Sequence, residues 1–314
     1  MKCVICNKTV SIIIAKELRK GEKRNVYLCK NCELGILDSK LSAEELKKFY
    51  SEEYRKVGTP NISHSSNPEE LFDTYSRFQN DRLKLLTPYL NKKTKLLEIG
   101  CSAGMFLYKV KNMVGEIAGI DFDKTSAEYA SKKCNCKVYT TDIKETPFPK
   151  KHFDMILAFQ TLEHVKNPYS FINDLKEYLV PGGIIVMEVP NLYDALAYLY
   201  ELPQHYRFYY HSSHLWYFTE KSLNLLMNKT GFKGKVYHTQ DYNILNHFHW
   251  IDTDKSDPDC NKGLSQPVLP MRKERSKEVK KAMSDFILSI DKNYKKLLVK
   301  HKITSNIIYI GKMK

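Results

Sequence analysis

Short, mostly apolar runs alternate along this chain with longer segments whose apolar residues recur at helical spacing. Brief runs without a polar alternation are typical of strands that are covered on both faces. They occur at 96–99, 117–120, 137–139, 153–158, 184–189, 235–240 and 306–310. Apolar residues three or four apart predict helices at 41–54, 68–89, 168–179, 219–230 and 276–299. Strands that alternate with helices in this way predict an α/β fold with a doubly wound, mainly parallel sheet.

Capping and loop residues refine the ends of these elements. Ser42 with Glu45 three residues later has the pattern of a capping box. The helix that starts at Pro68 is expected to run unbroken to Tyr89, and Gly231 ends the helix at 219–230. The polar stretches 58–68 and 252–270 are predicted to be loops, and the first is expected to be mobile.

The predicted helix at 276–299 is amphipathic with a basic outer face. Its apolar positions are Val279, Met283, Phe286, Ile287, Ile290, Tyr294 and Leu297. The strand at 306–310 follows it, so the segment 241–302 is an insertion before the last strand, and we expect it to lie near the mouth of the substrate site.

The ends of the first four strands carry polar or aromatic side chains. Glu98 ends the first strand, and Gly100 and Gly104 follow in a turn where the missing Cβ atoms allow a ligand to approach the backbone. The next two strands lead to Asp121 and Asp142, and the fourth to the pair 159–160. Parallel strands meet a ligand at this edge of a sheet. A carboxylate there disfavours a phosphate, and the G-x-G-x-x-G fingerprint of dinucleotide sites is incomplete. The edge therefore favours a cationic or hydroxyl-bearing cofactor.

With these motifs the chain resembles the class I S-adenosylmethionine-dependent methyltransferases over about residues 75–240 and the last strand. The matching segments are LLEIGCSAG (96–104), GIDFD (119–123), TTDI (140–143), FDMILAFQTLEHV (153–165) and LVPGGIIVMEVPN (179–191). The resemblance implies a Rossmann-like, seven-stranded sheet whose last strand is antiparallel and lies beside the fifth.

The resemblance also implies a role for each cofactor residue. The methionine part of S-adenosylmethionine would lie at the turn that carries Glu98, Gly100, Ser102 and Gly104. Asp121, with Phe122 after it, would bind the ribose, and Asp142 with Ile143 would bind the adenine edge. Phe159 and Gln160 would flank the cofactor. Ser102 replaces a glycine of the family and is expected to make the turn with a negative φ. Asp142 as a simple turn residue and Phe159 as a core residue remain alternatives.

Four cysteines near the start of the chain form two C-x2-C pairs, and these are Cys3, Cys6, Cys29 and Cys32. Four thiolates close a tetrahedral zinc site with no open position, so they predict a structural Zn²⁺ ribbon. A disulfide or free thiols are the alternatives. Because the N-terminus has no apolar signal core, we expect a cytoplasmic protein, in which disulfides are rare. The other cysteines, at 101, 134, 136 and 260, are interpreted as ordinary residues.

The predicted organisation has five parts. They are a zinc ribbon (1–40), N-terminal helices that cover the cofactor (41–95), the methyltransferase core (96–240), the insertion with its basic helix (241–302) and the last core strand (303–314). The formal net charge is +14, of which +9 lies in residues 255–314. Such a surface suits nucleic acid or an anionic small substrate, or is a solvated lysine-rich face. The sequence has no run of eighteen apolar residues, so it does not predict a membrane-spanning helix.

The segment 205–219 follows the fifth strand and is rich in His and Tyr. HLWYFT (214–219) resembles sugar methyltransferases that also carry four N-terminal cysteines, in which the position of His214 holds a proposed base. Ser213 and His211 replace the Glu and Tyr of that pattern, which puts C-methylation in doubt. His211 and His164, beside Glu163, are further catalytic candidates. Packing or capping roles are the alternatives for His214 and His164.

The resulting functional hypothesis is a methyltransferase for a carbohydrate or nucleotide-sugar intermediate, as in capsule polysaccharide biosynthesis, with His214 as general base. Arg207, His211 and residues 272–281 would meet a phosphate of the substrate. The first alternative is an RNA base methyltransferase with a zinc module, against which FQTLEHV (159–165) lacks an Asn-Pro-Pro-aromatic signature. Phosphate O-methylation of a small anionic metabolite, which needs no base, and a non-enzymatic binding protein are the others. The acceptor atom and the oligomeric state stay open.

Overall fold

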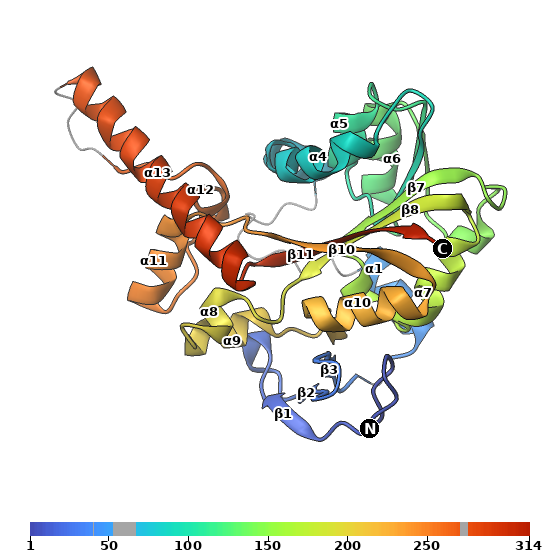
Figure 1. Ribbon diagram of the computed structural model, residues 1–314, viewed down its shortest axis with the longest axis horizontal. Coiled ribbons are helices and arrows are strands. Elements are labelled where there is room, and N and C mark those ends of the chain that lie inside the picture. Colours follow the sequence, from blue (N-terminus) through green and yellow to red (C-terminus); the bar gives the residue numbers. More distant parts are fainter. Residues whose placement is uncertain (40, 53–66, 271–275) are drawn as a thin grey trace.

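The computed structural model describes residues 1–39, 41–52, 67–270 and 276–314 of the 314-residue chain. Its centre is a seven-stranded sheet in the order β10-β11-β8-β7-β4-β5-β6 (Figure 1). The strands are β4 (Lys95–Ile99), β5 (Glu116–Ile120), β6 (Lys137–Tyr139), β7 (Phe153–Phe159), β8 (Leu179–Pro190), β10 (Phe232–Thr239) and β11 (Asn306–Met313). All seven predicted strands are confirmed. β11 lies antiparallel between β8 and β10, as the resemblance implied.

Helices cover both faces of this sheet. Figure 1 shows α4 (Asn80–Leu86), α5 (Met105–Val110) and α6 (Lys124–Cys134) on one side, with α7 (Pro168–Lys176) and α10 (Glu220–Lys229) on the other. The central strands are therefore buried on both faces, which explains their continuous apolar runs. Thr219 and Ser222 cap the start of α10 reciprocally, and Gly231 follows its end with a φ of +90°.

The expected single helix at 68–89 is wrong. The chain forms α3 (Pro68–Tyr75), a 3-10 turn (Ser76–Gln79), α4 and a second 3-10 turn (Thr87–Tyr89). Pro88 lacks the N–H that an α-helix needs there, which accounts for the last break. At the first break Gln79 turns inward and donates to the Tyr75 carbonyl oxygen at 3.1 Å. The breaks thus direct polar side chains of this segment toward the sheet.

The N-terminal residues build a second sheet that is not confined to them. β1 (Ile12–Ala15), β2 (Val26–Leu28) and β3 (Gly35–Leu37) continue into β9 (Trp216–Tyr217), a strand from the far end of the core. A 3-10 turn (Arg19–Gly21) connects β1 to β2, and the Arg19 guanidinium donates to the Phe208 carbonyl oxygen. α8 (Ala195–Tyr198) and α9 (Pro203–Tyr209) lie next to this module (Figure 1). The first forty residues therefore hold the segment 205–217 in place.

The helix α1 (Ala43–Glu52) connects the two sheets and begins as predicted. Ser42 and Glu45 exchange both bonds of the capping box, at 2.7 and 3.1 Å. The predicted mobile loop at 58–68 lies outside the described residues, except for its last two, where Asn67 caps α3. No helix in the described parts of the chain is long and apolar enough to cross a membrane.

The insertion before β11 contains more helix than predicted. Its helices are α11 (Ile244–Thr253), α12 (Cys260–Leu264) and α13 (Lys277–His301). The expected loop at 252–270 is wrong for α12, whose start Asp259 caps, and α11 was not predicted, although Asn243 caps it. α13 projects from the body (Figure 1). Its residues Ile287 and Leu298 are buried, but Val279, Met283 and Phe286 are exposed, so most of its apolar stripe has no core to cover.

Candidate active site

A cavity of about 1210 Å³ opens at the carboxyl edge of the seven-stranded sheet. Its volume exceeds the range of about 300–1000 Å³ that is usual for one small ligand, so it has room for a cofactor and an acceptor. Of the ten predicted cofactor residues, all but Gly104 line it, and the three histidine candidates do as well. Residues of α11 and α12 also line it, which agrees with the expected place of the insertion.

The geometry of the turn after β4 shows why glycine is needed at positions 100 and 104. Gly100 has a φ of +71°, and a Cβ there would overlap the Thr161 hydroxyl. Gly104 does not line the cavity. It caps α5 with a φ of +80° and lies against Ala130 and Cys134, so its role is to let the helix pack. The expectation for Ser102 is also wrong, because its φ is +49°. The Ser102 N–H donates to Asp121 at 2.7 Å, and this bond stabilises the left-handed turn.

Glu98 is a buried carboxylate beside the expected methionine position. Only 4% of the residue is exposed, and Oε2 has no hydrogen-bond partner among the described residues. Burial raises the pKa of Glu98 to about 8, although the Arg82 guanidinium opposes the shift. An orphaned buried oxygen of this kind is stabilised by a cationic ligand. The site therefore fits the ammonium and sulfonium of the cofactor that the resemblance implies.

The two aspartates after β5 and β6 are held by the backbone. Both oxygens of Asp121 accept N–H bonds, from Ser102 at 2.7 Å and from Asp123 at 2.9 Å. This orientation leaves further lone pairs of the carboxylate for a pair of hydroxyls. Asp142 accepts from the Lys144 N–H at 3.1 Å and caps the 3-10 turn Ile143–Glu145. Asp142 is therefore a turn residue, which was one of the two roles expected from the sequence. It also lines the cavity.

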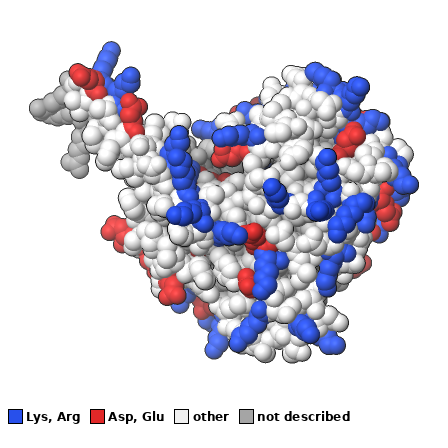
Figure 2. All heavy atoms as spheres, in the orientation of Figure 1, with Lys and Arg blue, Asp and Glu red and all other residues white. Residues whose placement is uncertain are grey.

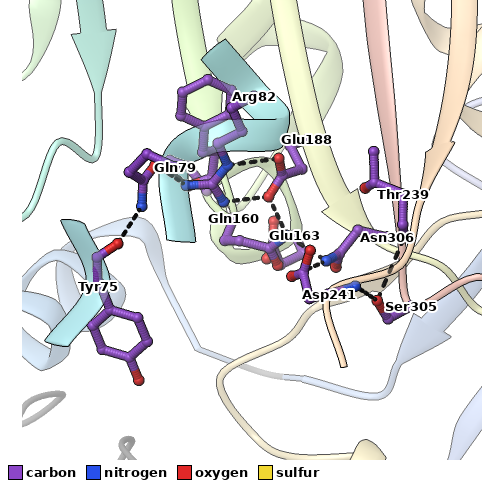
Figure 3. Close-up of polar contacts among 12 residues, drawn as sticks. Tyr75, Gln79, Arg82, Gln160, Glu163, Glu188, Thr239, Asp241, Ser305 and Asn306 are labelled. Carbon is purple, nitrogen blue, oxygen red and sulfur yellow. Dashed lines mark hydrogen bonds and ion pairs between the residues drawn. The ribbon is translucent and has the colours of Figure 1, made fainter. Parts of the chain in front are cut away.

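A polar network that sequence reasoning missed lies between the cofactor turn and the last strands (Figure 3). Arg82 of α4 binds both oxygens of Glu188 on β8, with Nε at 2.8 Å from Oε2. Gln160 donates to the same carboxylate at 2.9 Å and to Asn306 at 3.1 Å, and Asn306 donates to Asp241. Glu188 interrupts the apolar run 184–189, and that was the one signal in the sequence that could have revealed it.

Phe159 also contacts this network. The Arg82 guanidinium lies 4.4 Å from the centre of its ring, and the Phe106 ring packs edge-on at 5.0 Å. Only 6% of Phe159 is exposed. Phe159 is thus a core residue, which was one of the two roles expected from the sequence. It also lines the cavity, as Gln160 does.

The three histidine candidates lie close together around Glu163. Nε2 of His164 lies 3.8 Å and Nε2 of His214 3.9 Å from Oε1 of Glu163. The rings of His211 and His214 lie 3.7 Å apart between their centres. Burial raises the pKa of Glu163 to about 8 and lowers the pKa of His164 to about 4. Burial also lowers the pKa values of His211 and His214, so all three imidazoles are neutral at pH 7.

The backbone fixes this cluster. Nδ1 of His164 donates to the Ser213 carbonyl oxygen at 2.8 Å, and the Leu215 N–H donates to the Glu163 carbonyl oxygen at 2.8 Å. His214 lies between these two bonds. The hydroxyl of Tyr50, on α1, reaches both the Ser213 carbonyl oxygen and Nδ1 of His164 at 2.8 Å. The sequence identified the histidines and Glu163 beside His164, but it did not identify Tyr50, which contacts the cluster from α1.

Of the predicted phosphate contacts that lie in the described ranges, His211 lines the cavity, whereas Arg207 and residues 276–281 do not. Arg207 is largely exposed, lies 4.0 Å from Glu17 and is absent from the cavity wall. Residues 272–275 are outside the described ranges, and 277–281 lie on the projecting part of α13. The cationic side chains that do line the cavity belong to Arg19, Lys47, Arg82, Lys144 and Lys166.

The four N-terminal cysteines converge as the C-x2-C pairs predict. Sγ of Cys3 lies 3.5 Å from Sγ of Cys32, and the Cys6 and Cys29 sulfurs are 3.4 Å apart. All four sulfurs lie within 4.8 Å of one another, and none is in a disulfide. Sulfurs around a tetrahedral zinc ion lie about 3.8 Å apart, given a Zn–S distance of about 2.3 Å. The donor set and its spacing fit one such ion.

Comparison with known families and structures agrees with this geometry. Residues 69–236 match the family described as "Methyltransferase domain". A crystal structure of a SAM-dependent methyltransferase from Archaeoglobus fulgidus has a TM-score of 0.50 and 21% identity. The match covers 78% of this chain and 97% of that one. At this identity the likeness shows the fold.

Curated relatives match only in part. A probable S-adenosylmethionine-dependent methyltransferase of Mycolicibacterium smegmatis is 26% identical over 97 residues, or 31% of this chain and 38% of that protein. A ubiquinone biosynthesis O-methyltransferase of Rickettsia typhi is 24% identical over 164 residues, or 49% and 63%. This chain thus spans less than two thirds of the length of either relative.

Proposed function

The chain belongs to the methyltransferase-domain family, and from this we propose that it transfers a methyl group from S-adenosylmethionine to a small hydroxyl-bearing acceptor. The single observation that carries this proposal is the shared cavity. The predicted cofactor residues other than Gly104 and all three histidines of the Glu163 cluster line it, so donor and acceptor would meet within one cavity.

The chain's own residues would bind and orient the cofactor. Glu98 would balance its positive charges, Asp121 would accept from the ribose hydroxyls, and Asp142 with Ile143 would contact the adenine. When bound, S-adenosylmethionine supplies an electrophilic methyl carbon. What the protein adds is alignment of the acceptor with that carbon, at about 3 Å, and removal of a proton.

His214 is the proposed proton acceptor. Its imidazole is neutral, lines the cavity and is fixed by its backbone neighbours Ser213 and Leu215. Neutral imidazole has a free lone pair for the proton of a hydroxyl that approaches the methyl group. His211, stacked on His214, would orient the acceptor.

For the acceptor we propose a carbohydrate or nucleotide-sugar intermediate. In support, the cavity wall combines flat aromatic side chains with polar ones, among them Phe208, Trp250, Asn246 and Asp194. Sugar rings bind to such mixed surfaces through their apolar faces and hydroxyls. Arg19 and Lys47, which line the cavity, are the proposed contacts for a phosphate, in place of Arg207.

Incubation of the full chain with labelled S-adenosylmethionine tests this acceptor class. The panel holds nucleotide sugars, free sugars, phenols, phosphoesters and a short RNA. Label in a nucleotide sugar or sugar is the expected result. Label in phenols, RNA or phosphoesters instead overturns the carbohydrate proposal, and label in none of them overturns methyl transfer to these classes.

We also propose that the four-cysteine cluster holds a structural Zn²⁺ ion. Thiolates in a closed set of four leave no position for a substrate, so the ion would stabilise the fold of residues 1–39.

A further inference from the structure

We propose that Glu163, His164 and His214 form a second metal site. It would bind a divalent cation where the two imidazoles line the cavity. The ligand atoms of the three residues lie within 4.8 Å of one another. Binding of the ion does not depend on the activity proposed above. The role of the ion in catalysis does rest on that proposed function.

Glu163 supplies the first argument. Its side chain is fully buried, yet neither carboxylate oxygen has a hydrogen-bond partner among the described residues. Nε2 of each of the two imidazoles lies 3.8 or 3.9 Å from Oε1 of Glu163, which is too far for a hydrogen bond. A buried carboxylate without partners is costly, and a cation between it and the two imidazoles removes that cost.

His164 has the arrangement of a metal ligand. Its Nδ1–H donates to the Ser213 carbonyl oxygen, so the lone pair is on Nε2, the nitrogen that faces Glu163. Metal-binding histidines commonly donate their other ring N–H to a carbonyl or carboxylate, which fixes the tautomer and the ring orientation. Tyr50 contacts the same nitrogen and the same carbonyl group, and adds to this fixation.

The spacing suits a small ion. Ligand atoms of a four-coordinate zinc lie about 3.4 Å apart, given metal–ligand distances of about 2.1 Å. The separations of 3.8 and 3.9 Å from Glu163 Oε1 therefore need a contraction of about half an ångström. Three protein ligands leave a coordination position open, as in catalytic sites, and both histidines line the cavity into which that position would open.

The donor set indicates which ion to expect. Two imidazoles and one carboxylate suit Zn²⁺, Fe²⁺ or Co²⁺, whereas the four thiolates near the N-terminus form a softer, closed site. The two sites therefore differ both in ligand chemistry and in access from the cavity.

If an ion binds here, the methyl acceptor must carry a hydroxyl group that can occupy the open coordination position of the ion. Its charge lowers the pKa of that hydroxyl. The proton then leaves to solvent, the oxygen lone pair forms the C–O bond, and the pair of the broken S–C bond stays on sulfur. In this loaded state Nε2 of His214 is a ligand, and the ion takes over the proton-removing role that His214 has in the metal-free protein.

The test is metal binding by the full chain, stripped with chelator and then titrated with Co²⁺ or Zn²⁺. We expect two ions per chain. One Co²⁺ ion should show intense sulfur-to-metal charge-transfer absorption from the thiolates, and the other only the weak visible bands of nitrogen and oxygen ligands. Glu163→Gln and His214→Ala should each reduce the content to one ion and keep the thiolate absorption.

His152→Ala is the matched control. His152 forms a histidine–glutamate pair with Glu116 at 3.0 Å on the opposite edge of the sheet, and its loss should leave two ions. Calorimetry of cofactor binding shows whether each variant is folded. One ion in the unmutated chain, or two ions in Glu163→Gln, overturns the second site.

The same experiment separates this inference from the proposed function. Two ions with no methyl transfer to any acceptor support the metal site and overturn the activity. One ion with methyl transfer intact overturns the metal site and supports the proton-accepting role of His214.

Discussion

At the scale of single residues, the proposed chemistry depends on the carboxylates of Asp121, Glu98 and Glu163 and on the imidazole of His214. The orientation and the burial of each group result from its immediate surroundings. Asp121 is oriented by two N–H groups, whereas Glu98 and Glu163 are buried with oxygens that have no hydrogen-bond partner within the described parts of the chain. His214 is held by the bonds of its two neighbours in the chain. Each can therefore be tested by one substitution with a defined readout.

Asp121→Ala should weaken S-adenosylmethionine binding by about 1.5–3 kcal/mol, the range for hydrogen bonds to a charged group. The carboxylate faces the cavity, so the fold should persist. Calorimetry measures the loss, and Asp259→Ala, which removes the cap of α12 at a residue that is not part of the cavity wall, is the control. Unchanged cofactor affinity in Asp121→Ala would remove this residue from the site.

Glu98 predicts a pH dependence of cofactor binding. Its pKa is about 8 in the cofactor-free protein, so the carboxyl group is mostly protonated below that pH. A cationic ligand favours the carboxylate, lowers its pKa and releases a proton, so affinity should rise with pH until about pH 8 and then level off. Calorimetry of the protein and of Glu98→Gln gives the ratio of the two affinities. Titration of the cofactor itself affects both affinities equally, so it cancels from their ratio. A ratio that stays constant with pH would therefore contradict the prediction.

His214→Ala should lower turnover on the true acceptor by roughly 10²–10⁴-fold while cofactor affinity stays nearly constant. The reason is that His214 either takes the proton or holds the ion that replaces it. His211→Ala should have a smaller effect, through orientation of the acceptor. Single-turnover kinetics would locate the loss in the methyl-transfer step. Near-normal turnover in His214→Ala would leave His214 a packing residue.

At the scale of elements, the coupling between the two sheets is the main feature. β3 pairs with β9, and Gly35 lies so close to Tyr217 that a Cβ on Gly35 would come within 2.8 Å of the Tyr217 Cβ. Through β9 the N-terminal module fixes the segment that carries His211 and His214. The proposed zinc ion therefore supports a wall of the cavity although it lies outside the cavity.

Cys3→Ser should lose the ion of the four-cysteine cluster and increase hydrogen exchange in residues 1–39 and 211–217. Cofactor affinity should persist, because the residues of that site lie on the other sheet, whereas KM for the acceptor should rise. Metal analysis and hydrogen exchange measure both effects, and Cys136→Ser, at a residue outside both the cluster and the cavity wall, is the control. Less than about one zinc per unmutated chain would count against the structural role.

At the scale of the whole molecule, the net charge of +14 is uneven along the chain, since +9 of it lies in residues 255–314. Figure 2 shows Lys and Arg side chains spread over the visible face among acidic ones, without a continuous track. On this face the distribution is typical of a solvated surface rather than of a nucleic-acid interface, for which cationic side chains gather along one groove.

We therefore expect weak binding to a short RNA, with a shallow dependence of the logarithm of affinity on the logarithm of salt concentration. Fluorescence anisotropy between about 50 and 200 mM salt measures this slope. Submicromolar affinity with a steep slope would instead favour the RNA methyltransferase that the sequence left open.

The local pattern of the sequence was sufficient for the sheet and for both ends of the cofactor site. Apolar runs, capping residues and the spacing of cysteines act over a few residues, so the seven strands, the capping box at Ser42 and the four-cysteine cluster could be predicted. Asp121 and Asp142 could be placed in the same way, because the ends of parallel strands share one edge.

Tertiary structure alone decided what those elements hold between them. Arg82 and Glu188 are 106 positions apart, and no periodicity relates them. The positive φ of Ser102 is likewise stabilised by a bond to Asp121, a residue 19 positions later on the next strand's end. Glu163 lies within a local motif, yet its burial without a hydrogen bond results from the packing of 213–216 against it. Propensity and pattern are local, whereas the desolvation that gives these groups their chemistry arises only when remote segments pack together.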